Sequence, residues 1–207
     1  MLTKQEYEEM AEKIYMFHTK RAPGIAIGVI MVDFARDLLG TTADKVNAVS
    51  ETQACLSDVL QVMMGCTIGN RYLKVYKDLG RYALTLFDRG NGRGVRVFVD
   101  LEKIDAEKTP ELHRFFHRKR DKSVQKGGLA REESGRKIIA EFDTVGREIL
   151  GFQTVQVLKY GKPPMLPAHV CSECGESFLA RDDDHLVCDA CIGENMYYKE
   201  LPHGVER

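Results

Sequence analysis

Four of the six cysteines of this 207-residue chain stand in two short pairs. The pairs are Cys171-Ser-Glu-Cys174 and Cys188-Asp-Ala-Cys191, separated by residues 175–187. Each Cys-x-x-Cys pair presents two thiolates to one ion, and four sulfur ligands in a tetrahedron suit zinc and leave no open position for catalysis. We therefore predict a structural zinc site formed by Cys171, Cys174, Cys188 and Cys191.

Two other kinds of site use paired cysteines. A redox dithiol pair normally follows a strand and opens a helix, and that setting is missing here. An iron–sulfur cluster also takes four thiolates. A segment of about 40 residues cannot build a core of its own, so the metal should supply folding free energy, on the order of 10 kcal/mol. This use of cysteine favours a reducing compartment, and we expect a cytoplasmic protein.

The remaining two cysteines, Cys55 and Cys66, lie in an expected helix that opens near Glu51. A helical period places several residues on one inward-facing stripe: Glu51, Cys55, Val59, Val62 and Cys66. In an unbroken helix Cys55 and Cys66 would be about 16 Å apart, too far to share a metal. A break at Gly65 would be needed to bring them together.

Two interpretations of these cysteines remain open. Both can be small buried hydrophobic residues, as most free cysteines are. Alternatively Cys55, which lies early in a helix and one turn before Asp58, is a reactive thiolate or a metal ligand, because a helix N-terminus lowers a thiol pKa.

His18 ends the first expected helix, which opens with Thr3 and Glu6 at capping-box spacing. A histidine on an apolar helix face is either a satisfied core residue or a ligand. The next helix opens at Ala22-Pro23-Gly24, where free backbone N–H groups can receive an anion. His18 would lie beside that opening, which makes it a candidate site residue.

The pattern of the other elements predicts an α+β fold with helices packed on an antiparallel sheet. Residues 23–39 form an apolar helix that ends at Gly40, and a strand over 45–50 leads into the Cys55 helix through a Ser50 or Thr52 cap. The period then changes to two in three strands of an antiparallel meander, over residues 72–76, 81–87 and 95–99.

Further elements complete this core. A helix opens at Thr109 and carries the basic segment 113–122, which is either a solvated face or a phosphate contact. Another helix ends at Gly151, and a last strand covers 152–159. We expect a core domain over 1–160, a proline-rich linker over 161–168 and a small zinc finger over 169–207.

Charge and hydropathy exclude some classes of partner. The net charge of −1 gives no reason to expect nucleic acid. The longest apolar run, residues 22–32, is too short to cross a bilayer, and the polar first ten residues do not resemble a signal peptide. We therefore expect no membrane association.

Several motifs together resemble the FmdE family, which is named after a component of formylmethanofuran dehydrogenase. They are Phe17-His18, Pro23-Gly24 with Gly28, the set Glu51, Cys55, Asp58 and Gln61, the segment 65–69 (GCTIG) and the terminal cysteine pairs. The resemblance implies an α+β core, a homodimer and an auxiliary treble-clef zinc finger. It also implies association with the molybdenum or tungsten enzyme that reduces carbon dioxide onto methanofuran in methanogenesis, and no defined catalytic role.

The chain departs from that family's His-x-His-x-Cys-Pro-Gly pattern at two positions. Lys20 stands in place of the second histidine and Ala22 in place of the cysteine. His18, Cys55 and Cys66 remain as candidate catalytic residues. Such a set could hold a second zinc in the core or place a thiolate beside a base.

Three functional hypotheses follow. The first is an FmdE-like zinc protein that acts as a subunit or accessory of a molybdenum or tungsten C1 enzyme. The second is a separate thiol- or metal-dependent enzyme that uses Cys55 and His18. The third is a regulator that contacts RNA polymerase or nucleic acid, because the finger also resembles those of DksA/TraR-type proteins. We favour the first.

Overall fold

The computed structural model describes residues 1–40, 45–161, 165–195 and 197–198. The chain divides into two compact units, Met1–Gly161 and Lys162–Arg207, which are described separately. Part of the expected linker (162–164) and the end of the expected finger (199–207) lie outside the described residues. Within the described part of the chain, no helix combines the length and apolar character needed to span a bilayer.

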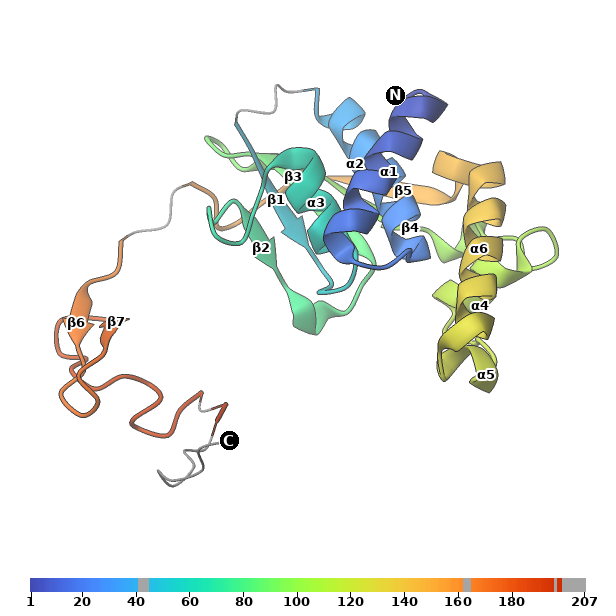
Figure 1. Ribbon diagram of the computed structural model, residues 1–207. Coiled ribbons are helices and arrows are strands. Elements are labelled where there is room, and N and C mark those ends of the chain that lie inside the picture. The colour runs from blue at the N-terminus through green and yellow to red at the C-terminus, as the bar shows by residue number, and fades with distance from the viewer. Residues whose placement is uncertain (41–44, 162–164, 196, 199–207) are drawn as a thin grey trace. The chain divides into compact units, whose positions relative to one another are not determined.

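A five-stranded sheet forms the centre of the first unit (Figure 1). Its strands are β1 (Val46–Ser50), β2 (Leu73–Val75), β3 (Ala83–Asp88), β4 (Arg93–Val99) and β5 (Leu150–Gln156), in the order β2-β1-β3-β4-β5. All neighbouring pairs are antiparallel except β1 and β2, which are parallel. The α+β fold class is thus confirmed.

The predicted meander was wrong at one strand. β2 does not pair with β3, because β1 lies between them. The chain leaves β1 through a helix and returns to the outer side of that strand, which is the connection that a parallel pair needs. A period of two identifies strands but does not identify their neighbours.

Helices α1 (Lys4–His18), α2 (Pro23–Leu39) and α3 (Leu56–Met64) cover one face of the sheet (Figure 1). Alternate strand residues contribute to the core on this face: Val46, Ala48, Leu84, Leu86, Val95 and Val97. The capping box of Thr3 and Glu6 is present at the start of α1, and α2 is buried along most of its length, as expected.

Three more helices form a group beside α2: α4 (Pro110–Phe116), α5 (Lys122–Gln125) and α6 (Gly128–Val145). α6 packs on α2 and carries α4 and α5. The basic segment 113–122 is not one helix, because α4 ends at Phe116 and Arg118 has a positive φ of 59°. The turns η2 (Lys77–Leu79), η3 (Leu101–Lys103) and η4 (Gly146–Ile149) connect the remaining elements, and η4 ends the last helix earlier than expected.

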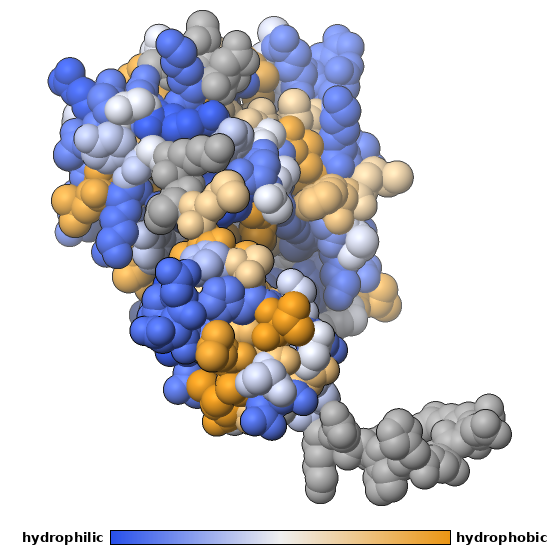
Figure 2. All heavy atoms as spheres, turned by 90° about the vertical axis from the view of Figure 1, so that its left-hand side faces the viewer, coloured by the Kyte–Doolittle hydropathy of each residue, from blue (hydrophilic) through white to orange (hydrophobic). Residues whose placement is uncertain are grey.

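In the C-terminal unit, β6 (Ala168–Val170) and β7 (Ser177–Leu179) form an antiparallel hairpin. Cys171 and Cys174 lie in the connection between these strands. Several large apolar side chains of this unit are exposed, and Figure 2 shows hydrophobic and hydrophilic residues side by side on its surface. The unit therefore has little apolar core to hold it together.

Candidate functional site

The four paired cysteines meet in the C-terminal unit. Their sulfur atoms all lie within 4.8 Å of one another. The backbone N–H of Cys188 donates to the Sγ atom of Cys171 over 3.3 Å. Hydrogen bonds from the backbone of Cys174 and then of Cys188 lower the pKa of the Cys171 thiol to about 6. Such N–H groups stabilise a thiolate, the form of cysteine that binds metal.

This arrangement fits a tetrahedral zinc ion. None of the four cysteines is in a disulfide. The neighbouring thiol of Cys188, with burial and the other two cysteines, raises the pKa of Cys191 to about 12. Four neighbouring thiols cannot all ionise without a counter-charge, because their negative charges repel one another. A bound divalent cation supplies that charge and lets all four ionise together. In the part of the chain that the structure describes, no other group of three or more histidine, cysteine or acidic residues is so placed.

A second group of polar side chains forms in the core where α1 ends and α3 begins. The Nδ1 atom of His18 lies 2.6 Å from the Oδ2 atom of Asp58, and its Nε2 atom lies 4.0 Å from the Sγ atom of Cys55. The amide of Gln61 donates to the other carboxylate oxygen of Asp58 over 3.4 Å. Asp58 thus orients the imidazole so that its second nitrogen faces the thiol. We call His18, Cys55 and Asp58 the core triad.

The backbone at Cys55 explains how this thiol is presented. α3 starts at Leu56, later than the predicted Ser50 or Thr52 cap, and Cys55 is its N-cap residue with φ 29° and ψ −53°. Ser50 does not cap the helix because its hydroxyl donates to the carbonyl of Thr52 over 2.6 Å. A non-glycine residue with positive φ is strained, and such strain is concentrated at functional sites.

The Cys55 thiol is not a preformed thiolate. Burial, and after it the negative charge of Asp58, raises the pKa of Cys55 to about 11. This contradicts the expectation that the helix start lowers the thiol pKa. The opposing factors are the low polarity around the sulfur and the like charge one turn along α3.

Cys66 does not join the core triad. Gly65 ends α3 with a φ of 61°, as predicted, yet Cys66 remains at the opposite end of this helix from Cys55. Its thiol is buried and donates to the carbonyl of Val46 over 3.4 Å. Burial raises its pKa to about 11. The surroundings of Cys66 are therefore those of a small apolar core residue.

A pocket of about 360 Å³ lies next to Cys55, at the end of the sheet where β1 and β4 end and β3 begins. Three arginines and four aromatic residues line it together with Cys55: Arg81, Arg96, Arg118, Tyr82, Phe98, Phe115 and Phe116. None of these seven was predicted as a catalytic or metal-binding residue, and Arg118 lies in the basic segment 113–122 for which a phosphate contact was one interpretation. They come from three separate segments, at the start of β3, in β4 and at the end of α4, and no single local motif joins them.

Gly24 allows the close packing at this pocket. The hydroxyl of Tyr82 donates to the carbonyl of Gly24 at the start of α2. A Cβ atom on Gly24 would lie 2.8 Å from that hydroxyl oxygen and 2.9 Å from the Sγ atom of Cys55. The glycine therefore permits α2, Tyr82 and Cys55 to meet.

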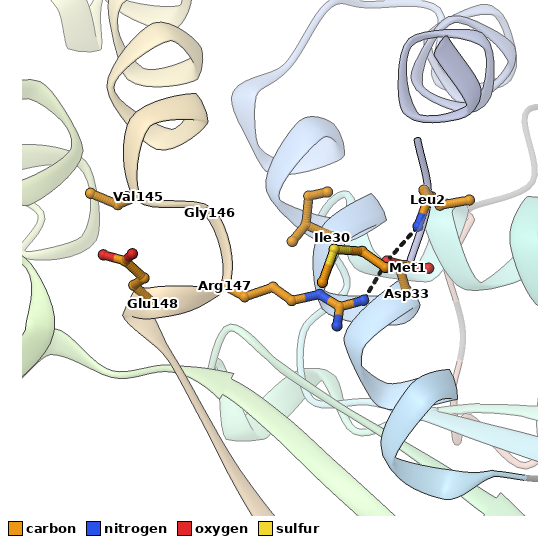
Figure 3. A pocket seen from close by; sticks show the side chains of 8 residues that line it. All are labelled: Met1, Leu2, Ile30, Asp33, Val145, Gly146, Arg147 and Glu148. Carbon is orange, nitrogen blue, oxygen red and sulfur yellow. Dashed lines mark hydrogen bonds and ion pairs between the residues drawn. The ribbon is translucent and has the colours of Figure 1, made fainter. Parts of the chain in front are cut away.

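Another pocket, of about 350 Å³, lies between the N-terminus, α2 and η4 (Figure 3). Its polar centre is Asp33, which accepts hydrogen bonds from the backbone N–H of Leu2 and from Arg147. Arg147 also binds Asp37 over 2.7 Å. Because the Asp33 carboxylate is already paired on two sides, this pocket has the character of a structural junction.

Comparison with known proteins identifies the family of this chain. The family model described as FmdE, molybdenum formylmethanofuran dehydrogenase operon, matches residues 17–159. The chain belongs to the FmdE family. The matched residues include the whole core triad and every residue of the pocket beside Cys55.

Two similar proteins extend the comparison. The crystal structure of a tungsten formylmethanofuran dehydrogenase FmdE-like protein from Syntrophus aciditrophicus matches with a TM-score of 0.75 and 33% identity, over 93% of this chain and 95% of that one. A probable S-adenosyl-L-methionine-binding protein from Archaeoglobus fulgidus is 30% identical over 203 residues, which are 91% of this chain and 53% of that protein. The chain thus spans about half the length of this second relative.

The two departures from the expected FmdE pattern lie close to the core triad in sequence. Ala22 is the N-cap of α2 and carries no ligand atom, and Lys20 is exposed. His18 and Cys55 therefore supply one nitrogen and one sulfur, with Asp58 occupied by His18. The core as described offers fewer ligands than the four-cysteine site.

Proposed function

We propose that this FmdE-family chain is a zinc-binding accessory protein or subunit that works with a molybdenum or tungsten formylmethanofuran dehydrogenase-type enzyme in methanogenesis-related C1 chemistry in the cytoplasm. The observation that carries the proposal is the FmdE match over residues 17–159, together with the similarity to the FmdE-like protein of Syntrophus aciditrophicus. Cys171, Cys174, Cys188 and Cys191 would hold the zinc as a structural ion.

Two structural expectations belong to this proposal. The hairpin of β6 and β7 carries the first cysteine pair in its turn, which supports a treble-clef finger. A homodimer is supported by β5, an edge strand of the sheet on which Phe152 is 52% exposed. An edge strand that carries an exposed aromatic side chain is suited to pairing with another chain. Light scattering of the purified chain would give its mass in solution.

The proposal is tested by isolating the tagged full-length chain from the cells that encode it and measuring molybdenum and tungsten in the complex. A stoichiometric amount of either metal, retained through a second purification step, is the expected result. A chain that is isolated with partners but without either metal would contradict the proposal. A Leu129→Ala variant, changed at a residue of α6 that is 82% exposed, serves as a control for handling.

A second candidate function is thiol- or metal-dependent chemistry in the core. It is favoured by the contact of His18 with both Asp58 and Cys55, which is the order of orienting acid, base and nucleophile found in covalent catalysis. Zinc content per chain separates the metal-dependent form from the accessory function. Two zinc ions in the parent, one of them lost only in Cys55→Ser, would support a metal site in the core, whereas one zinc, lost only in Cys171→Ser, would leave the finger as the metal site.

The regulator hypothesis has less support from the basic segment 113–122. Arg114 pairs with Glu111 over 2.5 Å, and Arg120 donates to the hydroxyl of Ser134 over 3.0 Å. Arg114 is thus paired within α4, and Arg120 joins the segment after α4 to α6, so these two side chains are not free to form a phosphate-binding stripe.

A further inference from the structure

The pocket beside Cys55 has an excess of positive charge. Three of its lining residues are arginines, Arg81, Arg96 and Arg118, and none of the lining residues is acidic. Two of these arginines pair with Glu51, which follows β1 and is 5% exposed. The net charge of these four side chains determines the charge of the ligand that the pocket can bind.

Glu51 neutralises one of the three arginines. Its carboxylate oxygens lie 2.6 Å from the Nε atom of Arg96, 3.0 Å from the Nη2 atom of Arg96 and 2.6 Å from the Nε atom of Arg81. Two guanidinium groups thus share a single carboxylate. The side chain of Arg118 forms no hydrogen bond or ion pair with any residue that the structure describes. Two positive charges therefore remain at the wall of the pocket.

Arg96 and Arg81 differ in how far their side chains are exposed and in how they pair with Glu51. Arg96 is 16% exposed, is bound in a bidentate manner by Glu51 and lies over the ring of Phe98 at 5.0 Å. Arg81 is 58% exposed, so part of its guanidinium group remains open to a ligand. Because Glu51 is buried and pairs with the largely covered Arg96, these two side chains form a firm base that positions Arg81 at the pocket.

Aromatic rings also line this pocket. The ring of Phe116 lies 5.6 Å from that of Tyr82 and 5.0 Å from that of Phe115, both edge to face. Phe98 adds a further ring from the end of β4. Such rings form an apolar surface on which a planar group can stack. The volume of about 360 Å³ lies within the range of small-molecule sites.

We propose that this pocket binds a small organic anion in which a planar ring carries a phosphate or a carboxylate. The ring lies against Phe115 and Phe116, and the anionic group is bound by Arg118 and the open side of Arg81. Cys55 is the only thiol among the lining residues, so the bound ligand lies beside the core triad. This assignment is independent of any association with a dehydrogenase.

The charge requirement can be tested with three compounds that share one ring. Adenosine monophosphate is a dianion, adenosine is neutral and S-adenosyl-L-methionine carries a net positive charge, while all three present adenine. Isothermal titration of the full-length, zinc-loaded chain should show the monophosphate binding at least about tenfold more tightly than adenosine, because an arginine–phosphate contact is a charge-assisted hydrogen bond. Raising the salt concentration should weaken the binding of the monophosphate and leave that of neutral adenosine unchanged.

Inorganic phosphate tests the contribution of the ring. It should bind more weakly than adenosine monophosphate, since it cannot use the aromatic wall. Equal affinity of the two would overturn the assignment of a ring-bearing ligand. Tighter binding of S-adenosyl-L-methionine than of the monophosphate, or no binding of any of the four compounds, would overturn the assignment of an anion site.

An arginine variant with a matched control locates the binding. Arg118→Gln removes the charge that has no partner among the described residues, and it should weaken the monophosphate by about tenfold while adenosine is unaffected. Arg93→Gln changes an exposed arginine at the other end of β4 and should leave both affinities unchanged. An equal effect of both variants, or none of Arg118→Gln, would show that the anion binds elsewhere. A thermal unfolding curve identical to that of the parent confirms that each variant is folded.

Discussion

Cys55 and Cys66 show how surroundings separate two residues of one type. Both thiols are buried enough for their pKa values to rise to about 11. Cys66 donates to the Val46 carbonyl and contacts no ionisable side chain of the core triad. Cys55 has strained backbone, faces the Nε2 atom of His18 and lines a pocket. Of the two, only the Cys55 thiol is placed to react with, or bind, a molecule that enters the pocket.

The raised pKa of Cys55 predicts slow alkylation at neutral pH. Because the thiolate is the reactive form, the rate of modification by iodoacetamide should stay low at pH 7.5 and rise toward pH 11. Asp58→Asn removes a negative charge that raises this pKa, so the rate at pH 8 should increase several-fold. Peptide mass spectrometry distinguishes Cys55 from the other cysteines.

Asp78→Asn is the control for that experiment, because Asp78 is an exposed residue of η2 that pairs with Lys77. It should leave the alkylation profile of Cys55 unchanged. A parent thiol that titrates below pH 8.5, or a slower reaction in Asp58→Asn, would contradict the electrostatic account.

At the scale of elements, the core triad depends on the close approach of α2 and α3. Gly24 and Gly28 lie one turn apart on α2, and both face α3 or its N-cap. A Cβ atom on Gly28 would lie 2.9 Å from the Cγ2 atom of Val59. The two glycines therefore set the spacing between these helices, and with it the position of Cys55.

Gly24→Ala should destabilise the first unit. The added methyl would meet the Tyr82 hydroxyl and the Cys55 sulfur at less than a normal contact distance, and such overpacking costs about 1–3 kcal/mol. Urea denaturation followed by circular dichroism measures the change. Gly135→Ala in α6 is the matched control, since its Cβ would lie 3.6 Å from the nearest atom, on Pro23.

In that control, alanine is the better helix former, so Gly135→Ala should be neutral or stabilising by about 0.5–1 kcal/mol. A Gly24→Ala protein as stable as the parent would mean that α2 and α3 can separate without cost. In that case the glycine would not determine how Cys55 is presented.

For the whole molecule, the two compact units differ in what stabilises them. Met1–Gly161 has a continuous apolar core that draws on the sheet and on five helices, α1, α2, α3, α4 and α6. The described part of the second unit has the short hairpin of β6 and β7 and the four-cysteine cluster. The first should therefore be stable by burial alone, and the second should depend on its metal.

Removal of the metal should accordingly unfold one unit and spare the other. With a strong chelator, hydrogen exchange should become fast in residues 165–195 and stay slow in β1, β3 and β4. Acidification should have the same effect, because metal binding requires deprotonated thiols, so the metal is lost as the pH falls. Cys171→Ser should reproduce the effect without chelator.

Cys55→Ser is the control in this exchange experiment and should leave residues 165–195 protected. Protection of these residues in Cys171→Ser would show that the second unit folds without its metal. Loss of protection in β1, β3 and β4 on chelation would show that the core also depends on a bound ion.

The sequence by itself determined the local features of this protein. The Cys-x-x-Cys spacing determines two cysteine pairs because the two cysteines of each pair are only three residues apart in the chain. The capping box at Thr3 and the stop at Gly65 are likewise decided within a few residues. The strands and the α+β class follow from the apolar period. The motif Cys55, Asp58 and Gln61 also lies on one turn-to-turn row of α3, so it was visible in the sequence as part of the FmdE resemblance.

Only the tertiary structure decided which distant groups meet. His18 and Asp58 are 40 residues apart, and Glu51 and Arg96 are 45 apart, so their pairing depends on how α1, α3 and the strands pack. The same packing places β1 between β2 and β3, leaves Cys66 away from Cys55, and raises a thiol pKa that the helix start alone would lower. Burial and charge act through space, and a one-dimensional pattern does not contain those distances.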